Sequence, residues 1–281
     1  MELVARLLGL LVLLLIGTGL RQVGILDTTR TARLNTVAYY FALPALVFTA
    51  TYDRNVAAIL TPALVVGIVG VLLSTAALAW LCNRHRALPD RQSVAMIQSY
   101  HSNLGYLGLP LVAATFSGEV TAVASVVLGI ASLVQVPITV VVLVSINGAD
   151  TSPVDQLAEL ATNPVLLALV AGIVIGSLGL PVAQPVTAIL DVLATLALPL
   201  ALLCVGATLQ VDRAGLDWGA TGSVVGLKLL VMPALAWAVF SALGVGAAAF
   251  TAAVVMLGTP SAVSTYVFAS ELGGDSQFAS L

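Results

Sequence analysis

The chain has few charged residues: Asp, Glu, Lys and Arg make up 8% of its 281 residues, while 60% are hydrophobic and the mean hydropathy is +1.10. A soluble domain carries roughly 25% charged residues, so this composition cannot cover a water-facing surface. The apolar runs are about 20 residues long, which is the length of a membrane-spanning helix, and they lack the alternation of a membrane β-barrel. The sequence therefore predicts an all-α polytopic membrane protein.

Cysteine and histidine are also scarce. The two cysteines, Cys82 and Cys204, lie inside apolar runs, and the chain has two histidines. No cysteine or histidine spacing indicates a disulfide framework or a metal site. No phosphate-loop, dinucleotide-binding or metalloprotease motif occurs, and no nucleophile with a base and an orienting group can be identified. We therefore expect no cofactor, no metal, no nucleic-acid partner and no enzymatic activity.

What the chain has is a duplicated pattern. Inside apolar runs, the tripeptide Ala-Leu-Pro occurs at 42–44 and again at 197–199, which is 155 residues later, and apolar segments follow each other in the same order around these two copies. Nine spans are predicted: Leu3–Leu20, Leu34–Tyr52, Ile59–Cys82, Val94–Phe116, Val120–Ile146, Pro164–Leu180, Val186–Leu209, Gly219–Leu243 and Ala247–Ser270.

The spans divide into a first five-helix repeat at 1–146, a polar linker at 147–163 and a second repeat at 164–281. Five spans per repeat turn the second repeat upside down relative to the first, as in many secondary transporters. The second repeat holds four spans before Leu281. Either the sequence ends before a tenth helix or the protein lacks that helix, and we favour the first alternative.

Arginine positions set the expected orientation. The loop after the first span carries Arg21, Arg30 and Arg33, and the loop after the third carries Arg84, Arg86 and Arg91, whereas the loop between the second and third spans has Arg54 alone. The two basic loops and the 147–163 linker are therefore predicted to be cytoplasmic, and the N-terminus to lie outside. Arg213 alone marks the corresponding loop of the second half.

The fourth and ninth spans concentrate polar residues, glycine and proline. The fourth reads Gln-Ser-Tyr-His-Ser-Asn-Leu-Gly-Tyr-Leu-Gly-Leu-Pro over 98–110, and the ninth reads Gly-Thr-Pro-Ser-Ala-Val-Ser-Thr-Tyr over 258–266. Pro110 and Pro260 remove backbone donors and interrupt helices. Paired interruptions at corresponding points of two repeats favour a transporter's binding site, where half-helix N-termini attract an anion. The alternative is a pair of proline-kinked helices that pack through hydroxyl groups.

Two further residues are ambiguous. Lys228 is the only lysine and lies inside the eighth span, where it could be a substrate counter-ion, a proton carrier or a fixed charge in place of sodium. The alternative is a lysine that snorkels to the headgroups. His101 could be a proton-linked switch or a hydrogen-bonded packing histidine.

Four motifs together resemble the auxin efflux carrier family, which includes plant PIN-type carriers and prokaryotic transporters. They are Phe-Ala-Leu-Pro-Ala-Leu-Val-Phe at 41–48, Asn-x-Gly-x-x-Gly-x-Pro at 103–110, Leu-Pro-Leu-Ala-Leu at 198–202 with Gly-Ala-x-Leu at 206–209, and Lys-Leu-x-x-x-Pro at 228–233. The chain looks like a short prokaryotic form of this family. The resemblance implies two inverted five-helix repeats, with the fourth and ninth helices crossing at Pro110 and Pro260. It also implies a small organic anion bound beside the crossing, at Asn103.

We therefore expect a secondary active transporter of the cell membrane that moves a carboxylate or auxin-like acid by alternating access. The expected substrate-binding residues are Asn103, Gly105, Tyr106, Ser261, Ser264, Thr265 and Lys228. A coupling proton, with His101 or Lys228 as its carrier, and a coupling sodium ion both fit the sequence. The lipid bilayer is the expected surrounding, and small-residue runs could pack a homodimer. The alternative function is a carrier-fold sensor or scaffold that does not transport.

Overall fold

A computed structural model describes residues 2–148, 158, 160–208 and 217–280. Within these ranges every regular element is helical, and the one β-type pairing is an isolated bridge between Ser102 and Ser261. The nine predicted spans all fall on helices. Five helical stretches are long and apolar enough to cross a membrane: Thr28–Thr51, Pro62–Asn83, Gly118–Asn147, Gln184–Thr208 and Trp218–Ala242. Shorter apolar helices occupy Leu8–Gln22, Leu104–Thr115, Pro164–Leu178 and Ala247–Leu257. The predicted class, an all-α polytopic membrane protein, is confirmed.

The helices belong to two compact units. The first unit comprises Met1–Ile59, Gly105–Val126 and Asn163–Leu209, and the second comprises Leu60–Leu104, Val127–Thr162 and Gln210–Leu281. Each unit takes segments from both predicted sequence repeats, so the units are not the repeats. The division into repeats at 1–146 and 164–281 stays a prediction. Most of the linker (149–157 and 159) and Arg213 lie outside the described residues.

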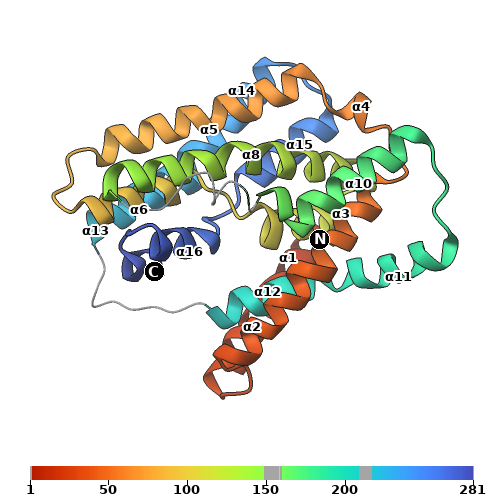
Figure 1. Cartoon of the computed structure of the whole chain (residues 1–281), viewed down its shortest axis with the longest axis horizontal. Coiled ribbons are helices and arrows are strands. Elements are labelled where there is room, and N and C mark those ends of the chain that lie inside the picture. Colours follow the sequence, from red (N-terminus) through yellow and green to blue (C-terminus); the bar gives the residue numbers. More distant parts are fainter. Residues whose placement is uncertain (1, 149–157, 159, 209–216, 281) are drawn as a thin grey trace. The chain divides into compact units, whose positions relative to one another are not determined.

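In the first unit, α1 (Glu2–Gln22) packs along α12 (Ala197–Thr208), and α3 (Leu43–Thr51) packs against α10 (Pro164–Leu178) and α11 (Gln184–Thr195) (Figure 1). Small residues permit these contacts. A Cβ at Gly206 would overlap the Leu14 carbonyl, and a Cβ at Gly172 would overlap the Thr51 hydroxyl. The helix α2 (Thr28–Val37) also contacts α12, while α4 (Val56–Ile59) contacts α10 and α7 (Leu109–Thr115) contacts α12.

In the second unit, α5 (Pro62–Asn83) lies between α6 (Pro89–Tyr100) and α14 (Met232–Ala242). The other contacting elements are α13 (Trp218–Gly226) on α6, α15 (Ala247–Leu257) on α14, and α16 (Ser264–Glu271) and α17 (Ser276–Ala279) on α6. The long α8 (Gly118–Asn147) enters this unit at Val127. An apolar cluster joins its Leu143 to Ile97 and Tyr100 of α6 and to Leu227.

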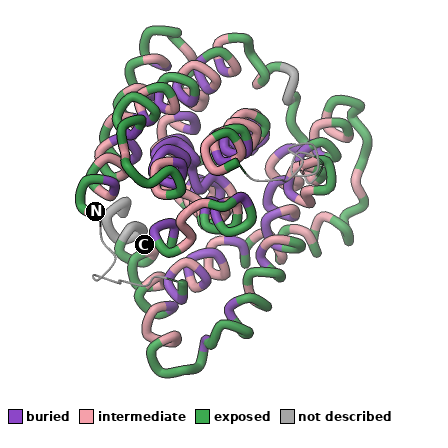
Figure 2. The backbone as a smooth tube through the Cα atoms, turned by 60° about the vertical axis from the view of Figure 1, so that its left-hand side comes forward, coloured by how far each residue is buried: buried purple, intermediate pink, exposed green. Residues whose placement is uncertain are grey.

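Exposed apolar residues are abundant in both units. Buried and exposed positions alternate along the helices (Figure 2), and large apolar side chains such as Leu133 (60% exposed), Leu230 (70%) and Trp237 (60%) are accessible. In water such surface would be costly to expose, but hydrocarbon tails cover it without penalty. The exposed surface thus agrees with the membrane assignment that composition predicts.

Three helices widen into a π-helical turn just before a proline. The turns are η1 (Ala38–Ala42), η2 (Leu104–Gly108) and η3 (Leu227–Val231), and the prolines that follow are Pro44, Pro110 and Pro233. In an ordinary α-helix a proline ring collides with the carbonyl four residues earlier. In η1 and η3 the pairing shifts to five residues, as Leu43 N–H donates to Ala38 and Met232 N–H to Leu227. These prolines therefore sit in continuous or newly begun helices rather than at a helix break.

Pro110 is a correction to the sequence interpretation. We expected the fourth span to break at this residue, but Pro110 lies in the first turn of α7. The interruption falls earlier, at His101–Asn103, between the end of α6 at Tyr100 and the start of η2 at Leu104. Pro260, by contrast, lies in the interruption of the ninth span, between α15 and α16.

Candidate functional site

The site is the place in the second unit where two interrupted helices cross. Ser99, His101, Ser102 and Asn103 have side chains that compete with helical backbone pairing, and His101 already has extended backbone angles (φ −77°, ψ 99°). The ninth span stops after Leu257 because Pro260 cannot donate to a helix and biases Thr259 away from helical angles. Both interruptions therefore follow from local sequence.

The two extended segments pair with each other in antiparallel fashion. Asn103 N–H donates to the Pro260 carbonyl at 2.9 Å, and Ala262 N–H donates to the His101 carbonyl at 3.0 Å. Backbone groups that have left a helix at membrane depth must find partners inside the protein. The crossing supplies two of those partners, with Ser102 opposite Ser261 at its centre.

In such a pairing, the N–H and C=O of Ser102 point away from Ser261, and Gln135 of α8 satisfies both. The Gln135 side chain accepts from Ser102 N–H at 3.1 Å and donates to the Ser102 carbonyl at 3.2 Å. Gln135 is 3% exposed. The Gln135 side-chain amide therefore pairs with the Ser102 backbone as the backbone of a neighbouring strand would. Gln135 is not among the predicted site residues, although an amide within an apolar span is a usable signal.

Lys228, in the π-helical turn η3, reaches the same centre. Its Nζ donates to Ser102 Oγ at 2.5 Å and to the Leu257 carbonyl at 2.9 Å, and lies 3.1 Å from Met232 Sδ. The residue is 1% exposed and its ammonium is bonded inside the protein, which argues against the alternative that it snorkels to the headgroups. Among the described residues its ammonium has no carboxylate partner. Instead it meets the last carbonyl of α15, where the helix dipole is negative.

His101 is held by hydroxyl groups on two elements. Its Nδ1 lies 2.9 Å from Thr139 Oγ1 of α8, and its Nε2 lies 3.5 Å from Ser264 Oγ at the start of α16. Tyr100 OH lies 3.3 Å from the same Thr139 oxygen. A hydroxyl can donate or accept a hydrogen bond. The hydroxyls of Thr139 and Ser264 can therefore pair with either neutral tautomer of His101. Thr139 is the second residue that sequence analysis missed.

The remaining predicted residues divide between the two units. Ser261 Oγ donates to the Gln98 carbonyl at 2.6 Å, and Thr265 Oγ1 donates to the Ala262 carbonyl at 2.6 Å, so both hydroxyl protons are already used. Asn103 is 6% exposed, and its side-chain amide makes no hydrogen bond within the described part of the chain. Gly105, Tyr106 and Pro110 belong to the first unit, where the Tyr106 ring stacks on Tyr39 at 6.4 Å.

The structure thus brings Asn103, Ser261, Ser264, Thr265, Lys228, His101 and Pro260 into one unit. At the crossing they present a buried cation, a buried amide and several hydroxyls. No described group of three or more histidine, cysteine, aspartate or glutamate side chains could hold a metal ion. What these features define is a multi-pass membrane protein with an interrupted-helix crossing, an architecture typical of solute carriers.

Comparison with known proteins gives the family. A model of the membrane transport protein family matches residues 3–156 and 154–280, and the chain belongs to this family. The chain is also 29% identical, over 269 residues, to an uncharacterized transporter of Methanothermobacter thermautotrophicus, with 94% of this chain and 87% of the relative covered. The resemblance to the auxin efflux carriers and the transporter class are therefore confirmed.

Proposed function

We propose that the protein is a secondary active transporter that moves a small organic anion, such as a carboxylate or an auxin-like acid, across the cytoplasmic membrane by alternating access. The transport family and the apolar helices support the general role. The substrate class rests on the chemistry of the crossing, where an amide, hydroxyls and a cation gather without a described acidic side chain in hydrogen-bond contact.

The observation that carries the proposal is the free amide of Asn103. Asn103 is 6% exposed and its amide is unbonded within the described residues, so the amide donors and acceptor are available to a ligand at the crossing. The amide offers two N–H donors and a carbonyl acceptor. Its donors match a carboxylate oxygen, and we assign Asn103 as the main substrate contact.

The other residues contribute in different ways. The Ser264 hydroxyl, 3.5 Å from His101, is the hydroxyl with the most freedom to turn toward a substrate. The hydroxyls of Ser261 and Thr265 already donate hydrogen bonds to backbone carbonyls, so toward a substrate they can act only as acceptors. Lys228 contributes positive charge rather than direct contact, because three neighbours already surround its ammonium. Gly105 and Tyr106 remain proposed contacts.

Coupling and orientation are part of the same proposal. A proton could be carried by His101, which lies between two hydroxyls, or by Lys228, and a sodium ion is the alternative driver. The arginines at 21, 30 and 33 favour a cytoplasmic position for the loop after α1, which places the N-terminus outside. A homodimer remains compatible with this arrangement.

The test combines ligand-induced thermal stabilisation with uptake into proteoliposomes, using a panel of carboxylates that includes indole-3-acetate. We expect one anion to raise the melting temperature by several degrees and to be taken up. Asn103→Ala should lose both effects, while Asn55→Ala, which removes the same group from an exposed loop, should keep them. Wild-type uptake by Asn103→Ala would overturn the assignment of the site. Stabilisation without uptake would favour the alternative function, a sensor or scaffold.

A further inference from the structure

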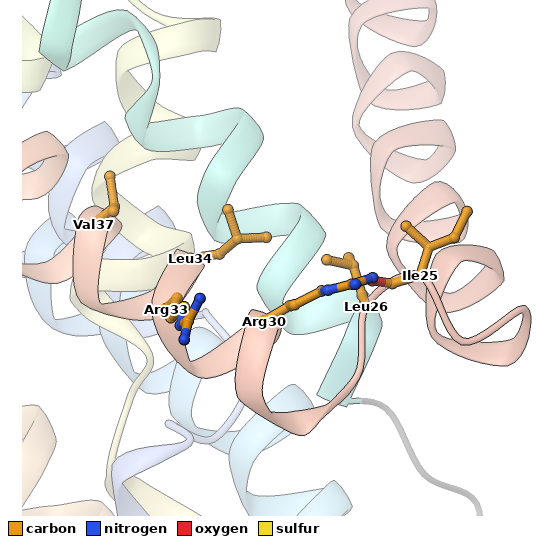
Figure 3. A pocket seen from close by; sticks show the side chains of 6 residues that line it. All are labelled: Ile25, Leu26, Arg30, Arg33, Leu34 and Val37. Atoms are coloured by element: carbon orange, nitrogen blue, oxygen red, sulfur yellow. The ribbon is translucent and has the colours of Figure 1, made fainter.

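A groove in the first unit lies between the loop after α1 and the first turns of α2, and none of the residues that line it is a proposed substrate contact. Its volume is about 370 Å³, and it is lined by Ile25, Leu26, Arg30, Arg33, Leu34 and Val37 (Figure 3). The volume falls within the usual range of small-molecule sites, roughly 300–1,000 Å³. The walls of the groove are almost wholly apolar, so Arg30 and Arg33 line it mainly with the hydrocarbon part of their side chains.

The spacing on α2 gives this groove a direction. Arg30, Arg33, Leu34 and Val37 follow the i, i+3, i+4, i+7 pattern of a single helix face, and all four line the groove (Figure 3). The two arginines stand in the first turns of α2, and the aliphatic residues follow toward the interior of the Thr28–Thr51 span. The face thus changes from cationic to apolar along one helix, as a lipid does from its headgroup to its chains.

Arg33 is the better placed of the two cations for an outside anion. It is exposed, and no described residue is bonded to its guanidinium. Arg30 Nη1 donates to the Ile25 carbonyl at 2.8 Å, and its Nε lies 3.8 Å from Asp27 Oδ2. That ion pair is long and leaves other N–H groups of Arg30 unused. Paired guanidinium groups are well suited to phosphate oxygens.

Beyond the arginines, the apolar face continues with accessible side chains. Val37 is 41% exposed and Phe41, one turn further, is 55% exposed. Both belong to a helix that is long and apolar enough to cross a membrane. An acyl chain can cover these side chains, whereas a small water-soluble anion cannot.

We propose that this groove binds an anionic glycerophospholipid. The phosphate lies between Arg30 and Arg33, and one acyl chain runs along Leu34, Val37 and Phe41. Basic pockets beside membrane helices on the cytoplasmic side commonly hold anionic headgroups, and the loop that carries these arginines is one of those expected to face the cytoplasm.

The experiment is native mass spectrometry of the purified full chain with phosphatidylglycerol, phosphatidylcholine or inorganic phosphate. We expect a retained phosphatidylglycerol adduct that is roughly fivefold weaker in Arg33→Gln and weaker again in Arg30→Gln/Arg33→Gln. Arg84→Gln removes an equal charge from another predicted cytoplasmic loop and should bind as the wild type does. Leu34→Asn, which keeps both arginines, should also weaken the adduct.

Three results would overturn the proposal. An equal loss in Arg84→Gln would show a diffuse effect of charge. Equal retention of phosphatidylcholine would remove the role of the anionic headgroup. Displacement of the lipid by millimolar inorganic phosphate, with no effect of Leu34→Asn, would identify a site for a soluble anion. Thermal melting of each variant in detergent shows whether the fold is intact.

Discussion

Lys228 donates a hydrogen bond from Nζ to the Leu257 carbonyl oxygen at 2.9 Å, across 29 residues of sequence. Leu257 is the last residue of α15, so its carbonyl has no partner within the helix. The lysine thereby caps a helix that ends inside the second unit. Ser102 Oγ donates to the same carbonyl at 3.1 Å, so one oxygen links the lysine to both interrupted spans.

Substitution of Lys228 distinguishes a role of its charge in transport from a role of its side chain in packing. In Lys228→Met the Leu257 carbonyl keeps its bond from Ser102, and no buried charge is left unpaired. Replacement of a buried ion by an apolar side chain of similar volume is often neutral for stability. We therefore expect the free energy of unfolding to change by no more than about 1 kcal/mol, while uptake of the organic anion is lost. Lys228→Arg should keep the charge but not fit, because three close neighbours surround Nζ.

The measurement is thermal unfolding in detergent beside uptake into proteoliposomes. Uptake at the wild-type rate by Lys228→Met would remove the proposed electrostatic role. A loss of stability of several kcal/mol would instead make the lysine a structural clamp.

In contrast to Lys228, substitution of Gln135 is expected to lower stability. In Gln135→Leu the N–H of Ser102 loses its partner in a buried place, whereas the Ser102 carbonyl keeps the hydrogen bond from the Leu104 N–H at 2.9 Å. One unsatisfied buried group costs roughly 1–3 kcal/mol, so we expect the free energy of unfolding to fall by about 1–3 kcal/mol and the melting temperature to drop. Gln184→Leu changes the same group on an exposed position of α11 and should melt like the wild type. Equal melting of both variants would mean that the backbone of Ser102 finds other partners.

The spans were predictable because hydropathy depends on composition alone, and apolar runs of helical length can form little else in a membrane. The interruption of the fourth span was predictable in kind but not in position. Proline was the obvious cause, yet Pro110 is accommodated by the π-helical turn before it. The actual break lies at His101–Asn103, where polar side chains and a partner strand favour extended backbone.

Gln135 and Thr139 could not be predicted in their roles. Their importance depends on which face of α8 meets the crossing, and a uniformly apolar helix gives no periodic signal for that face. The burial of Lys228 likewise depends on the neighbours that provide its acceptors, Ser102 and Leu257. Such contacts come from tertiary structure rather than from local sequence.

The carboxyl group of Asp217 is expected to make the stability of the protein depend on pH. It is the N-cap of α13, where the Ala220 N–H, then Arg86 and the Gly219 N–H, lower the pKa of its carboxyl group below the ordinary value. A carboxyl group whose pKa is lowered by folding stabilises the protein above its unfolded pKa, about 3.9, and this contribution is lost as pH falls through the folded value.

We therefore expect wild-type stability to decline below about pH 4 partly through Asp217. Asp217→Asn keeps a good N-cap and should flatten this acid decline, whereas Asp217→Ala should also lose about 1 kcal/mol at neutral pH. The pairs to Arg86 and Arg91, at 3.6 and 3.8 Å, are long and partly exposed, so they add little. Melting temperatures of the three proteins from pH 3 to pH 7 test this, and parallel curves would contradict it.

Gly206 tests the packing of α1 on α12. A Cβ at this position would overlap the Leu14 carbonyl and meet the Thr18 backbone nitrogen at 3.1 Å, and the Gly206 carbonyl already accepts a bond from Thr18 Oγ1 at 2.9 Å. Because the obstacles are backbone atoms, α1 must shift as a whole. We expect Gly206→Ala to lower stability by roughly 1–3 kcal/mol and Gly206→Leu to prevent accumulation of folded protein.

Gly222→Ala is the matched control, because Gly222 lies in α13 and an alanine methyl group at this position would meet no atom within 4 Å. Alanine is the better helix former by about 1 kcal/mol, so this variant should melt at or above the wild-type temperature. The comparison isolates close helix approach from helix propensity, since propensity favours alanine at both positions. If Gly206→Ala were also stabilised, α1 would not pack against α12 at this distance.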